Sequence, residues 1–404
     1  MKNNIIIKNN FSKVFLKTKN LKIKNSVISS NLKQITKEIE KKKDVFHSFS
    51  KSFNFNFRES DLKRYNRFDT IAIIGMGGSI LGSKAIFSFL RHKIKKKILF
   101  LDNLNENKVK DLINEQRKNN ILFIIISKSG NTIETLTNVN LLKNAKLRSS
   151  NTIVITEKGL SALNDIALKA KIPLIEHKKY IGGRYSVLSE VGMVPAKLMG
   201  LKINNFRKNL LNHFKNKNKK SLISSISEMS KIFSSPEISS IVFFNYCSQL
   251  DEFTQWAQQL FAESLGKKGK GLTPVLSNGP KDHHSLLQLY LEGPKDKVFY
   301  IFSSKDIYNY RVQGNYLNKK FKFLKNKKLN KIILSQKNAF TQVLKKKNIP
   351  FREFVINDFS EETIGELFSY FMLETVLIGK AIKVNPFNQP SVEEVKVLTK
   401  RYLS

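Results

Sequence analysis

Short apolar runs alternate with longer amphipathic stretches from about residue 70 onward. The runs of the first half are IAIIG (71–75), ILFLD (98–102), ILFIIIS (121–127), TIVIT (152–156) and IPLIE (172–176). Such continuous, Ile-rich runs are typical of strands buried on both faces, and stretches of helical length, such as 132–145, separate them. The alternation predicts a parallel sheet that is covered by helices on both faces.

The same alternation resumes after a basic, Asn-rich segment at 203–222. The later runs are ISSIVFFNY (238–246), KVFYIFSS (297–304), KIILSQ (331–336) and FREFVI (351–356). We therefore predict an α/β protein with two αβα sandwich domains, each with a mainly parallel sheet flanked by helices. The predicted divisions are an N-terminal helical lead-in (1–44), a first domain (45–202), a second domain (203–382) and a C-terminal turn and helix (383–404). The last helix is predicted to start near Ser391, because SVEE has the spacing of a capping box.

Composition narrows the class of protein further. Hydrophobic residues make up 41% of the 404 residues, which indicates a globular chain. No apolar run approaches the roughly 18 residues of a membrane span, and Lys and Asn interrupt the apolar segments at the N-terminus, unlike a secretory signal. The single cysteine, Cys247, excludes an internal disulfide and a cysteine-based zinc site, so a reducing cytoplasm is expected.

The formal net charge of +39 has three possible interpretations. It can reflect a composition rich in Lys, Asn and Ile throughout, it can steer an anionic substrate, or it can mark a nucleic-acid binder. The basic residues are spread along the whole chain, and no zinc-finger spacing, RNP-like aromatic run or basic-zipper pattern accompanies them. Nucleic acid is therefore not the expected partner.

The stretch SKSGNTIET, 127–135, follows the longest apolar run and opens a predicted helix. Backbone N–H groups at a helix N-terminus attract anions, phosphate above all. Ser127, Ser129 and Thr132 can donate hydroxyl hydrogen bonds to phosphate oxygens, and Gly130 permits a tight turn. The alternative is that these residues simply cap the helix N-terminus, but one cap needs one hydroxyl and this stretch offers three.

Two glycine-rich turns are further candidates. GMGGSILGSK, 75–84, also joins a strand to a helix, but Ile80 stands where a dinucleotide-binding loop needs its third glycine. Close backbone approach to a small polar ligand and a plain strand–helix turn both remain open. In GGRYS, 182–186, Arg184 could stabilise developing negative charge, although an arginine after a turn is more often solvated.

Three later segments carry groups suited to proton transfer. In QQLFAESLGK, Gln259, Glu263 and Lys267 share one helix face, and Gly266 is a natural stop. The position of Glu263 near the negative end of the helix dipole is favourable for a general base. The alternative is that the three side chains form an ordinary polar row on the helix surface. The segment DHHSLLQLYLEGP holds two adjacent histidines whose side chains point in different directions, so a shared metal is not expected. The segment NPFNQPSVEEVK leads into the last helix.

The order of these segments resembles that of the phosphoglucose isomerase family, which is built from two sugar-isomerase (SIS) domains. The matching blocks are GMGGSILGS, SKSGNTIET, GGRYSVLSEVGMVPAKLMG, QLFAESLGK, DHHSLLQLYLEGP and NPFNQPSVEEVK. They span residues 75–396, and their combination is far more specific than any single block. The sequence departs from the family at His283, where many relatives have Gln, and at Ser391, where Gly is usual.

The resemblance implies four catalytic residues. Glu263 resembles the base that moves a proton between C2 and C1, and Arg184 resembles the arginine that stabilises the enediolate. His284 resembles the ring-opening histidine, which in the family reaches the site from the partner subunit. Lys396 resembles the lysine near the ring oxygen.

The resemblance also implies a set of substrate-binding residues. They comprise a phosphate loop, turns that contact the sugar, and two glutamines beside the base and the phosphate. These residues are Ser127, Lys128, Ser129 and Thr132; Gly78, Ser79 and Gly183; and Gln259 and Gln389.

The implied activity is the reversible isomerisation of glucose 6-phosphate and fructose 6-phosphate through a cis-enediol(ate), in glycolysis and gluconeogenesis. It implies no metal and no other cofactor, a cytoplasmic homodimer and no membrane partner. A phosphosugar sensor without turnover is the alternative, and would usually carry a DNA-binding domain, but the first 70 residues show no clear helix-turn-helix pattern. Binding of nucleic acid by charge alone would collapse with salt.

Overall fold

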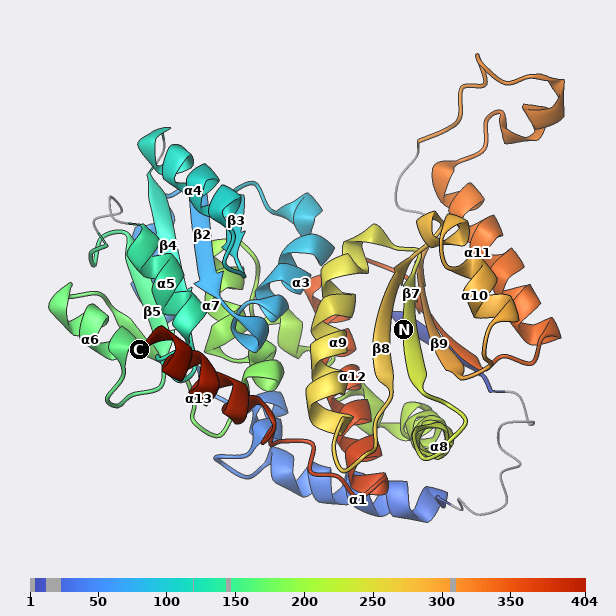
Figure 1. Cartoon of the computed structure of the whole chain (residues 1–404), viewed down its shortest axis with the longest axis horizontal. Helices are drawn as coiled ribbons and strands as arrows, with labels where there is room; N and C mark the ends of the chain where they lie inside the picture. The colour runs from blue at the N-terminus through green and yellow to red at the C-terminus, as the bar shows by residue number, and fades with distance from the viewer. Residues whose placement is uncertain (1–3, 12–22, 119, 143–146, 306–309) are drawn as a thin grey trace.

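Two five-stranded sheets stand side by side in the computed structural model, which describes residues 4–11, 23–118, 120–142, 147–305 and 310–404 (Figure 1). All five strands of the first sheet are parallel, in the order β3-β2-β4-β5-β6. Their bounds are Thr70–Gly75 (β2), Lys97–Leu101 (β3), Ile121–Ile126 (β4), Thr152–Thr156 (β5) and Leu174–Glu176 (β6). Each of the five apolar runs predicted in this half forms a strand.

Helices cover both faces of the first sheet, which explains the continuous apolar runs. In β2, Ala72 and Ile74 join a core with the helices α4, α5 and α6, whereas Ile71 and Ile73 join the main core with α3 and α7. The helix bounds are Leu81–Phe89 (α3), Glu106–Lys118 (α4), Ile133–Leu141 (α5), Ala162–Lys169 (α6) and Glu190–Leu198 (α7). A short helix, Glu59–Leu62 (α2), precedes the sheet.

The second sheet has the order β1-β10-β9-β7-β8 and is parallel except for β1. Its bounds are Ile5–Asn10 (β1), Ser240–Asn245 (β7), Thr273–Asn278 (β8), Lys297–Ser304 (β9) and Phe351–Ile356 (β10). The helices around it are Asn25–Ile39 (α1), Asn216–Phe233 (α8), Asp251–Leu265 (α9), Leu287–Glu292 (α10), Leu329–Lys346 (α11) and Glu361–Ala381 (α12). The mixed α/β architecture with two mainly parallel sheets confirms the predicted fold class.

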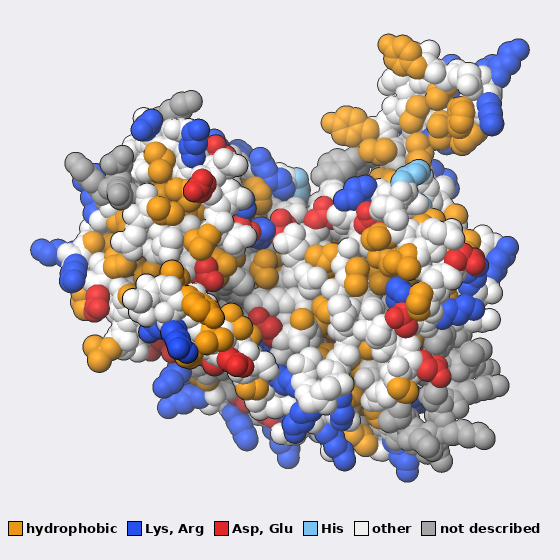
Figure 2. All heavy atoms as spheres, viewed as in Figure 1, with side chains coloured by type: hydrophobic (Ala, Val, Ile, Leu, Met, Phe, Trp, Pro, Cys, Tyr) orange, Lys and Arg blue, Asp and Glu red, His pale blue; other side chains and the backbone are white. Residues whose placement is uncertain are grey.

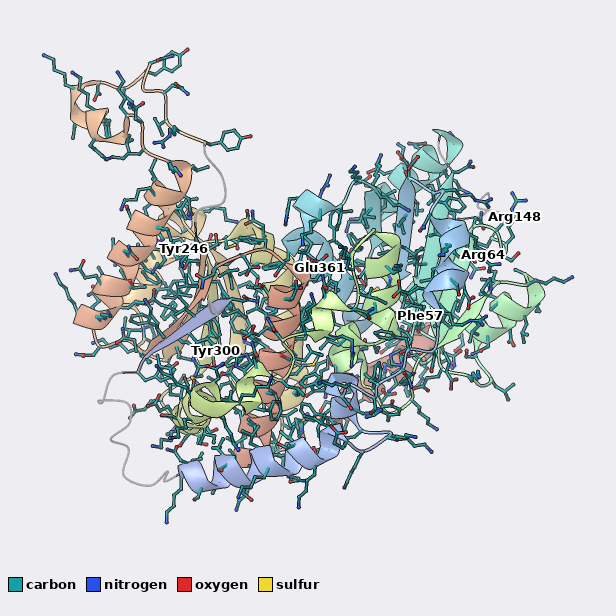
Figure 3. All side chains as sticks on the ribbon, turned by 180° about the vertical axis from the view of Figure 1, so that it is seen from behind. Phe57, Arg64, Arg148, Tyr246, Tyr300 and Glu361 are labelled. Carbon is teal, nitrogen blue, oxygen red and sulfur yellow. The ribbon has the colours of Figure 1, made fainter. Side chains whose placement is uncertain are left out.

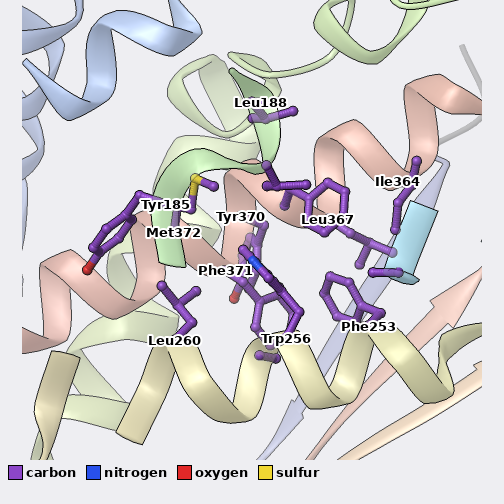
Figure 4. Packing of buried hydrophobic residues seen from close by; sticks show 14 of the residues in the cluster. Tyr185, Leu188, Phe253, Trp256, Leu260, Ile364, Leu367, Tyr370, Phe371 and Met372 are labelled. Carbon is purple, nitrogen blue, oxygen red and sulfur yellow. The ribbon is translucent and has the colours of Figure 1, made fainter. Parts of the chain in front are cut away.

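Aromatic packing joins α9 to α12 within the second half, and the same core includes Tyr185 and Leu188 of the first half (Figure 4). The ring of Phe253 lies 5.1 Å from that of Phe371, and Trp256 lies 4.8 Å from Phe368, measured between centroids. On its other side α9 packs against α3 of the first half, and Figure 1 shows these two helices between the sheets. Because α9 touches both halves, it can present side chains to both. We propose the divisions 1–44, 45–202, 203–382 and 383–404 on the basis of this two-sheet arrangement.

Two sequence predictions about elements are wrong. Residues 1–44 were expected to form a helical lead-in, and Asn25–Ile39 is a helix, but Ile5–Asn10 forms strand β1. This strand pairs Ile5 with Ile356, a partner that no local pattern reveals. The run KIILSQ was expected to be a strand, but it lies within α11, where Phe340 and Leu344 continue an apolar face at helical spacing. A short apolar run fits both periods. Strand β8 was not predicted, since its run is interrupted by Pro274 and Ser277.

A fully buried ion pair anchors the N-terminal strand. Arg352 on β10 pairs with Glu374 on α12, and it donates to the Tyr300 hydroxyl at 3.0 Å. The same guanidinium donates to Asn9 Oδ1 on β1 at 2.8 Å. Figure 3 shows Tyr300 within the second half of the molecule. Strand β1 is thus held by side chains as well as by its ladder.

The last helix, Val392–Leu403 (α13), lies against the first half of the molecule and buries none of its residues (Figure 1). It starts where predicted, but the capping box does not form, because Ser391 has helical backbone angles and its side chain makes no capping hydrogen bond. Within the part of the chain that the structure describes, no helix is both long and apolar enough to cross a membrane.

Candidate functional site

Two turns meet closely at the carboxyl end of the first sheet. The 3-10 turn Gly77–Ser79 follows β2, and the 3-10 turn Gly183–Leu188 follows β6. A Cβ atom on Gly78 would lie 2.2 Å from the carbonyl carbon of Gly183 and 2.5 Å from the backbone nitrogen of Arg184. Only glycine fits there, and this contact fixes the backbone from which Arg184 extends.

Arg184 is the hub of the site, and it is only 3% exposed. Nε donates to Ser264 Oγ at 2.8 Å, and Nη1 donates to Glu263 Oε2 at 3.2 Å and to Gln389 Oε1 at 2.5 Å. Nη2 donates to the backbone carbonyls of Pro386 at 2.7 Å and Asn388 at 3.1 Å. The guanidinium therefore joins the first half, α9 and the segment 385–389, rather than facing solvent as its local sequence suggested.

Glu263 lies in the last turn of α9, as its helical pattern predicted, and its side chain is 27% exposed. Gln259 Nε2 donates to Oε1 at 2.8 Å, one turn earlier on the same face, and Arg184 donates to Oε2. Two hydrogen-bond donors thus fix the orientation of this carboxylate. No described group hydrogen-bonds to the buried Oε1 of Gln259.

The predicted phosphate loop joins β4 to α5. Ser127 Oγ and Thr132 Oγ1 lie 2.8 Å apart, and Gly130 has a φ of +66°, which permits the tight turn. The Thr132 side chain makes no capping hydrogen bond to α5, so capping does not explain this hydroxyl. Ser129 Oγ accepts from the backbone nitrogen of Asn131 at 3.2 Å. The loop combines hydroxyls with a helix N-terminus, which is the geometry expected for a phosphate.

Lys128 points from the same loop toward the segment after β6. Its Nζ donates to the carbonyl oxygen of Lys179 at 2.9 Å and lies 3.5 Å from Glu157 Oε1. The structure thus gives Lys128 two protein partners. Ser79 is buried in its turn next to Gly78.

The two adjacent histidines have different surroundings. His283 Nε2 lies 2.5 Å from the Tyr246 hydroxyl, and its ring packs against Phe244 and Phe340. His284 is exposed, and no described residue hydrogen-bonds to its ring. Because His283 is held in the second half by Tyr246, His284 is the histidine that is free to act on a ligand.

Lys396 lies apart from the Arg184 cluster. It sits on α13 with a 60% exposed side chain and pairs with Glu393 at 2.6 Å. Apolar side chains around it on α13 are exposed as well: Val395, Val397, Leu398, Tyr402 and Leu403. Of the predicted residues, the structure therefore brings together Gly78, Gly183, Arg184, Gln259, Glu263 and Gln389, and it leaves His284 and Lys396 outside that cluster.

Sequence reasoning missed Tyr185 as a support of the cluster, and it named Lys267 only as part of a polar helix face. The Tyr185 hydroxyl lies 2.9 Å from Ser264 Oγ and donates to the Pro386 carbonyl at 2.9 Å. Lys267 Nζ donates to three carbonyl oxygens, those of Glu263 and Ser264 at 2.8 Å and that of Asn385 at 2.7 Å. Burial, and next the charge of Arg184, lower the pKa of Lys267 to about 8. A lysine directly after a helix-ending glycine was the available signal.

Comparisons with known proteins agree with this geometry. A family model described as phosphoglucose isomerase matches residues 8–277. The glucose-6-phosphate isomerase of Methanocaldococcus jannaschii is 31% identical over 84% of this chain and 86% of its own length, and that of Mycoplasmopsis synoviae is 30% identical over 82% and 81%.

Solved structures show the same fold. A hypothetical protein from Thermus thermophilus superposes with a TM-score of 0.84 at 22% identity, covering 98% of this chain and all of that one. A glucose-6-phosphate isomerase from Chlamydia trachomatis superposes with a TM-score of 0.70 at 19% identity, covering 97% of this chain and 77% of that one.

Proposed function

The chain belongs to the phosphoglucose isomerase family, and on that premise we propose that it interconverts glucose 6-phosphate and fructose 6-phosphate. The enzyme is an isomerase. The observation that carries the proposal is the Glu263 carboxylate, which is held between Gln259 and Arg184 where both halves of the molecule meet. This arrangement places a base beside a fixed positive charge, as an enediolate intermediate requires.

Proton transfer follows from that geometry. Glu263 removes the proton from C2 of the open-chain aldose, and the C1 carbonyl oxygen becomes an enediolate oxygen. The hydroxyl proton then moves from the C2 oxygen to the C1 oxygen, and protonated Glu263 returns its proton to C1, which leaves a ketone at C2. Arg184 stabilises the negative charge of the intermediate, a contribution of about 3–4 kcal/mol for a buried donor of this kind. Gln259 holds the base in place. The reaction moves hydrogen within one molecule, so the mechanism needs no external electron acceptor.

The other predicted residues position the substrate. Ser127, Lys128, Ser129 and Thr132 bind the phosphate, Gln389 contacts the phosphate side, and Gly78, Ser79 and Gly183 line the sugar. A phosphate held at one end of the sugar makes proton transfer at C1 and C2 effectively intramolecular. Gln389 already accepts from Arg184, so a ligand here displaces or shares that hydrogen bond.

Ring opening requires an acid and a base at the ring oxygen and the C1 hydroxyl, and His284 and Lys396 supply them. Both side chains lie outside the Arg184 cluster in the single chain, and both are exposed. A homodimer in which each subunit provides His284 to its partner's site accounts for the separation of His284. The exposed apolar side chains of α13 support an interface between subunits. The compartment proposed is the cytoplasm.

The test is turnover of fructose 6-phosphate to glucose 6-phosphate by purified protein, with EDTA present, beside Glu263→Gln. Rapid turnover by the wild type and near-complete loss in the variant are expected. Binding of fructose 6-phosphate without turnover by the wild type would instead identify a phosphosugar sensor and refute the catalytic roles. Size-exclusion chromatography with light scattering tests the dimer.

A further inference from the structure

A cavity of about 680 Å³ lies beside the segment that follows β6, apart from the Arg184 cluster. Four parts of the chain line it: Lys42 and Lys43 after α1, His47, the stretch 52–56, and the residues 176–180. None of its lining residues belongs to the site proposed for isomerisation. Its volume is in the range of cavities that hold small organic ligands.

The floor of this cavity is built from fixed, buried groups. Lys178 Nζ donates to Asn56 Oδ1 at 2.6 Å and pairs with the fully buried Glu190 at 2.8 Å, so its charge is neutralised. His47 is 6% exposed, and its Nδ1 lies 3.1 Å from the carbonyl oxygen of Ile39. No described residue hydrogen-bonds to the other ring nitrogen of His47. Such a floor keeps its shape whether or not a ligand is bound.

The walls carry positive charge without protein partners. Lys and Arg make up 71 of the 404 residues, so about two are expected among the eleven lining residues, yet four are found. Of these, Lys42, Lys43 and Lys179 have no carboxylate partner among the described residues. The only acid in the lining is Glu176, and Lys158 pairs with it at 3.2 Å. The cavity therefore presents three free ammonium groups.

This concentration differs from the general basic character of the surface. Figure 2 shows Lys and Arg side chains distributed over both halves of the visible face. In the cavity they border a concave space that also contains amide and hydroxyl groups, those of Asn54, Asn56 and Ser52. Unpaired charges around a concavity focus the potential and attract anions more strongly than charges on a convex surface.

We propose that this cavity binds a small polyanion, an organic polyphosphate in chemical class. The three free lysines would neutralise the phosphates, and the side chains of Asn54 and Ser52 would hydrogen-bond to the remainder of the ligand. The cavity connects to the phosphate loop through one hydrogen bond, since the carbonyl of Lys179 accepts from Lys128. Binding here is independent of the isomerase proposal and is measurable without turnover.

Isothermal titration calorimetry of the full chain at physiological salt tests the proposal. ATP and inorganic tripolyphosphate are the probes, and each is titrated with and without saturating fructose 6-phosphate. We expect binding that persists in the presence of the sugar phosphate. The paired variant Lys42→Gln, Lys43→Gln should weaken it at least about tenfold, because a lost charge-assisted hydrogen bond typically costs that much.

The matched control is Lys345→Gln, Lys346→Gln, which removes the same charge from two adjacent exposed lysines at the end of α11. It should change the affinity less than twofold. Equal affinity for the two probes would show that the phosphate chain alone is recognised, and tighter binding of ATP would show that the nucleoside contributes. Absence of binding, displacement by fructose 6-phosphate, or equal loss in both paired variants would overturn the proposal.

Discussion

Replacing Arg184 by Lys tests whether this side chain both holds the two halves together and stabilises the intermediate. The guanidinium makes five hydrogen bonds, to one carboxylate, one amide, one hydroxyl and two carbonyls. A lysine ammonium has three donors and cannot reproduce the planar fork, so at least two buried acceptors lose their partner. Each loss costs about 1–3 kcal/mol, and we expect the free energy of unfolding to fall by about 2–5 kcal/mol.

The effect on catalysis is separable from the effect on stability. Loss of a donor to the developing negative charge lowers kcat by about 10²–10³-fold. Urea denaturation followed by circular dichroism measures the first quantity, and turnover of fructose 6-phosphate at a temperature where the variant is folded measures the second.

Arg207→Lys is the matched control for this prediction. Arg207 is a part-buried arginine that donates to the Ser50 carbonyl at 2.6 Å and packs over Phe53, away from the Arg184 cluster. It should lose stability with kcat within about threefold of the wild type. An Arg184→Lys enzyme that keeps its stability within about 0.5 kcal/mol and its kcat within twofold would refute the role given to this residue.

Three other predictions follow from contacts of the same kind. Lys267→Met should reduce kcat/KM about tenfold, and Lys267→Arg should partly restore it. Wild-type kcat/KM should decline above about pH 8, because burial lowers the pKa of Lys267 to about 8 and its ammonium then loses its proton; a flat pH profile would exclude Lys267 as a support of the site. Gly78→Ala should lower kcat/KM at least about tenfold and destabilise the fold by about 1–3 kcal/mol, since its methyl group would strike the backbone of Gly183; wild-type kinetics would show that the turn can move. Burial raises the pKa of Glu366 to about 7, so stability falls as pH rises from about 4.5 to 7; burial lowers the pKa of neighbouring His213 to about 4, so stability rises as pH rises from about 4 to 6.5. Because these two effects cancel, Glu366→Gln should reveal a rise in the free energy of unfolding between about pH 4 and 6.5, and an unchanged pH dependence would contradict the assignment.

The sequence predicted those parts of the fold whose signal is local. Strands such as β2 and β4 are buried on both faces, so their own residues identify them. The run KIILSQ failed because a few apolar residues satisfy both a strand and a helix. Strand β1 failed because what makes it a strand is its partner β10, some 350 residues away.

The candidate site shows the same division. The helix of Glu263 and the turn of Gly78 follow from local patterns, and the order of the motifs indicated the family. The burial of Arg184 does not follow from a local pattern, because two of its acceptors are the backbone carbonyls of Pro386 and Asn388, and any residue type supplies a carbonyl. The separation of Lys396 from Glu263 likewise depends on tertiary structure.

The pairing of β1 with β10 also sets an order of events during synthesis. Ile5 leaves the ribosome long before its partner Ile356, and at about 5–20 residues per second the interval is roughly 20–70 s. For that time the nascent chain carries an apolar segment, Ile5–Ile7, with no strand to pair with. The edge of the second sheet can close only after nearly the whole polypeptide has been made, so the N-terminal segment stays without its strand partner until then.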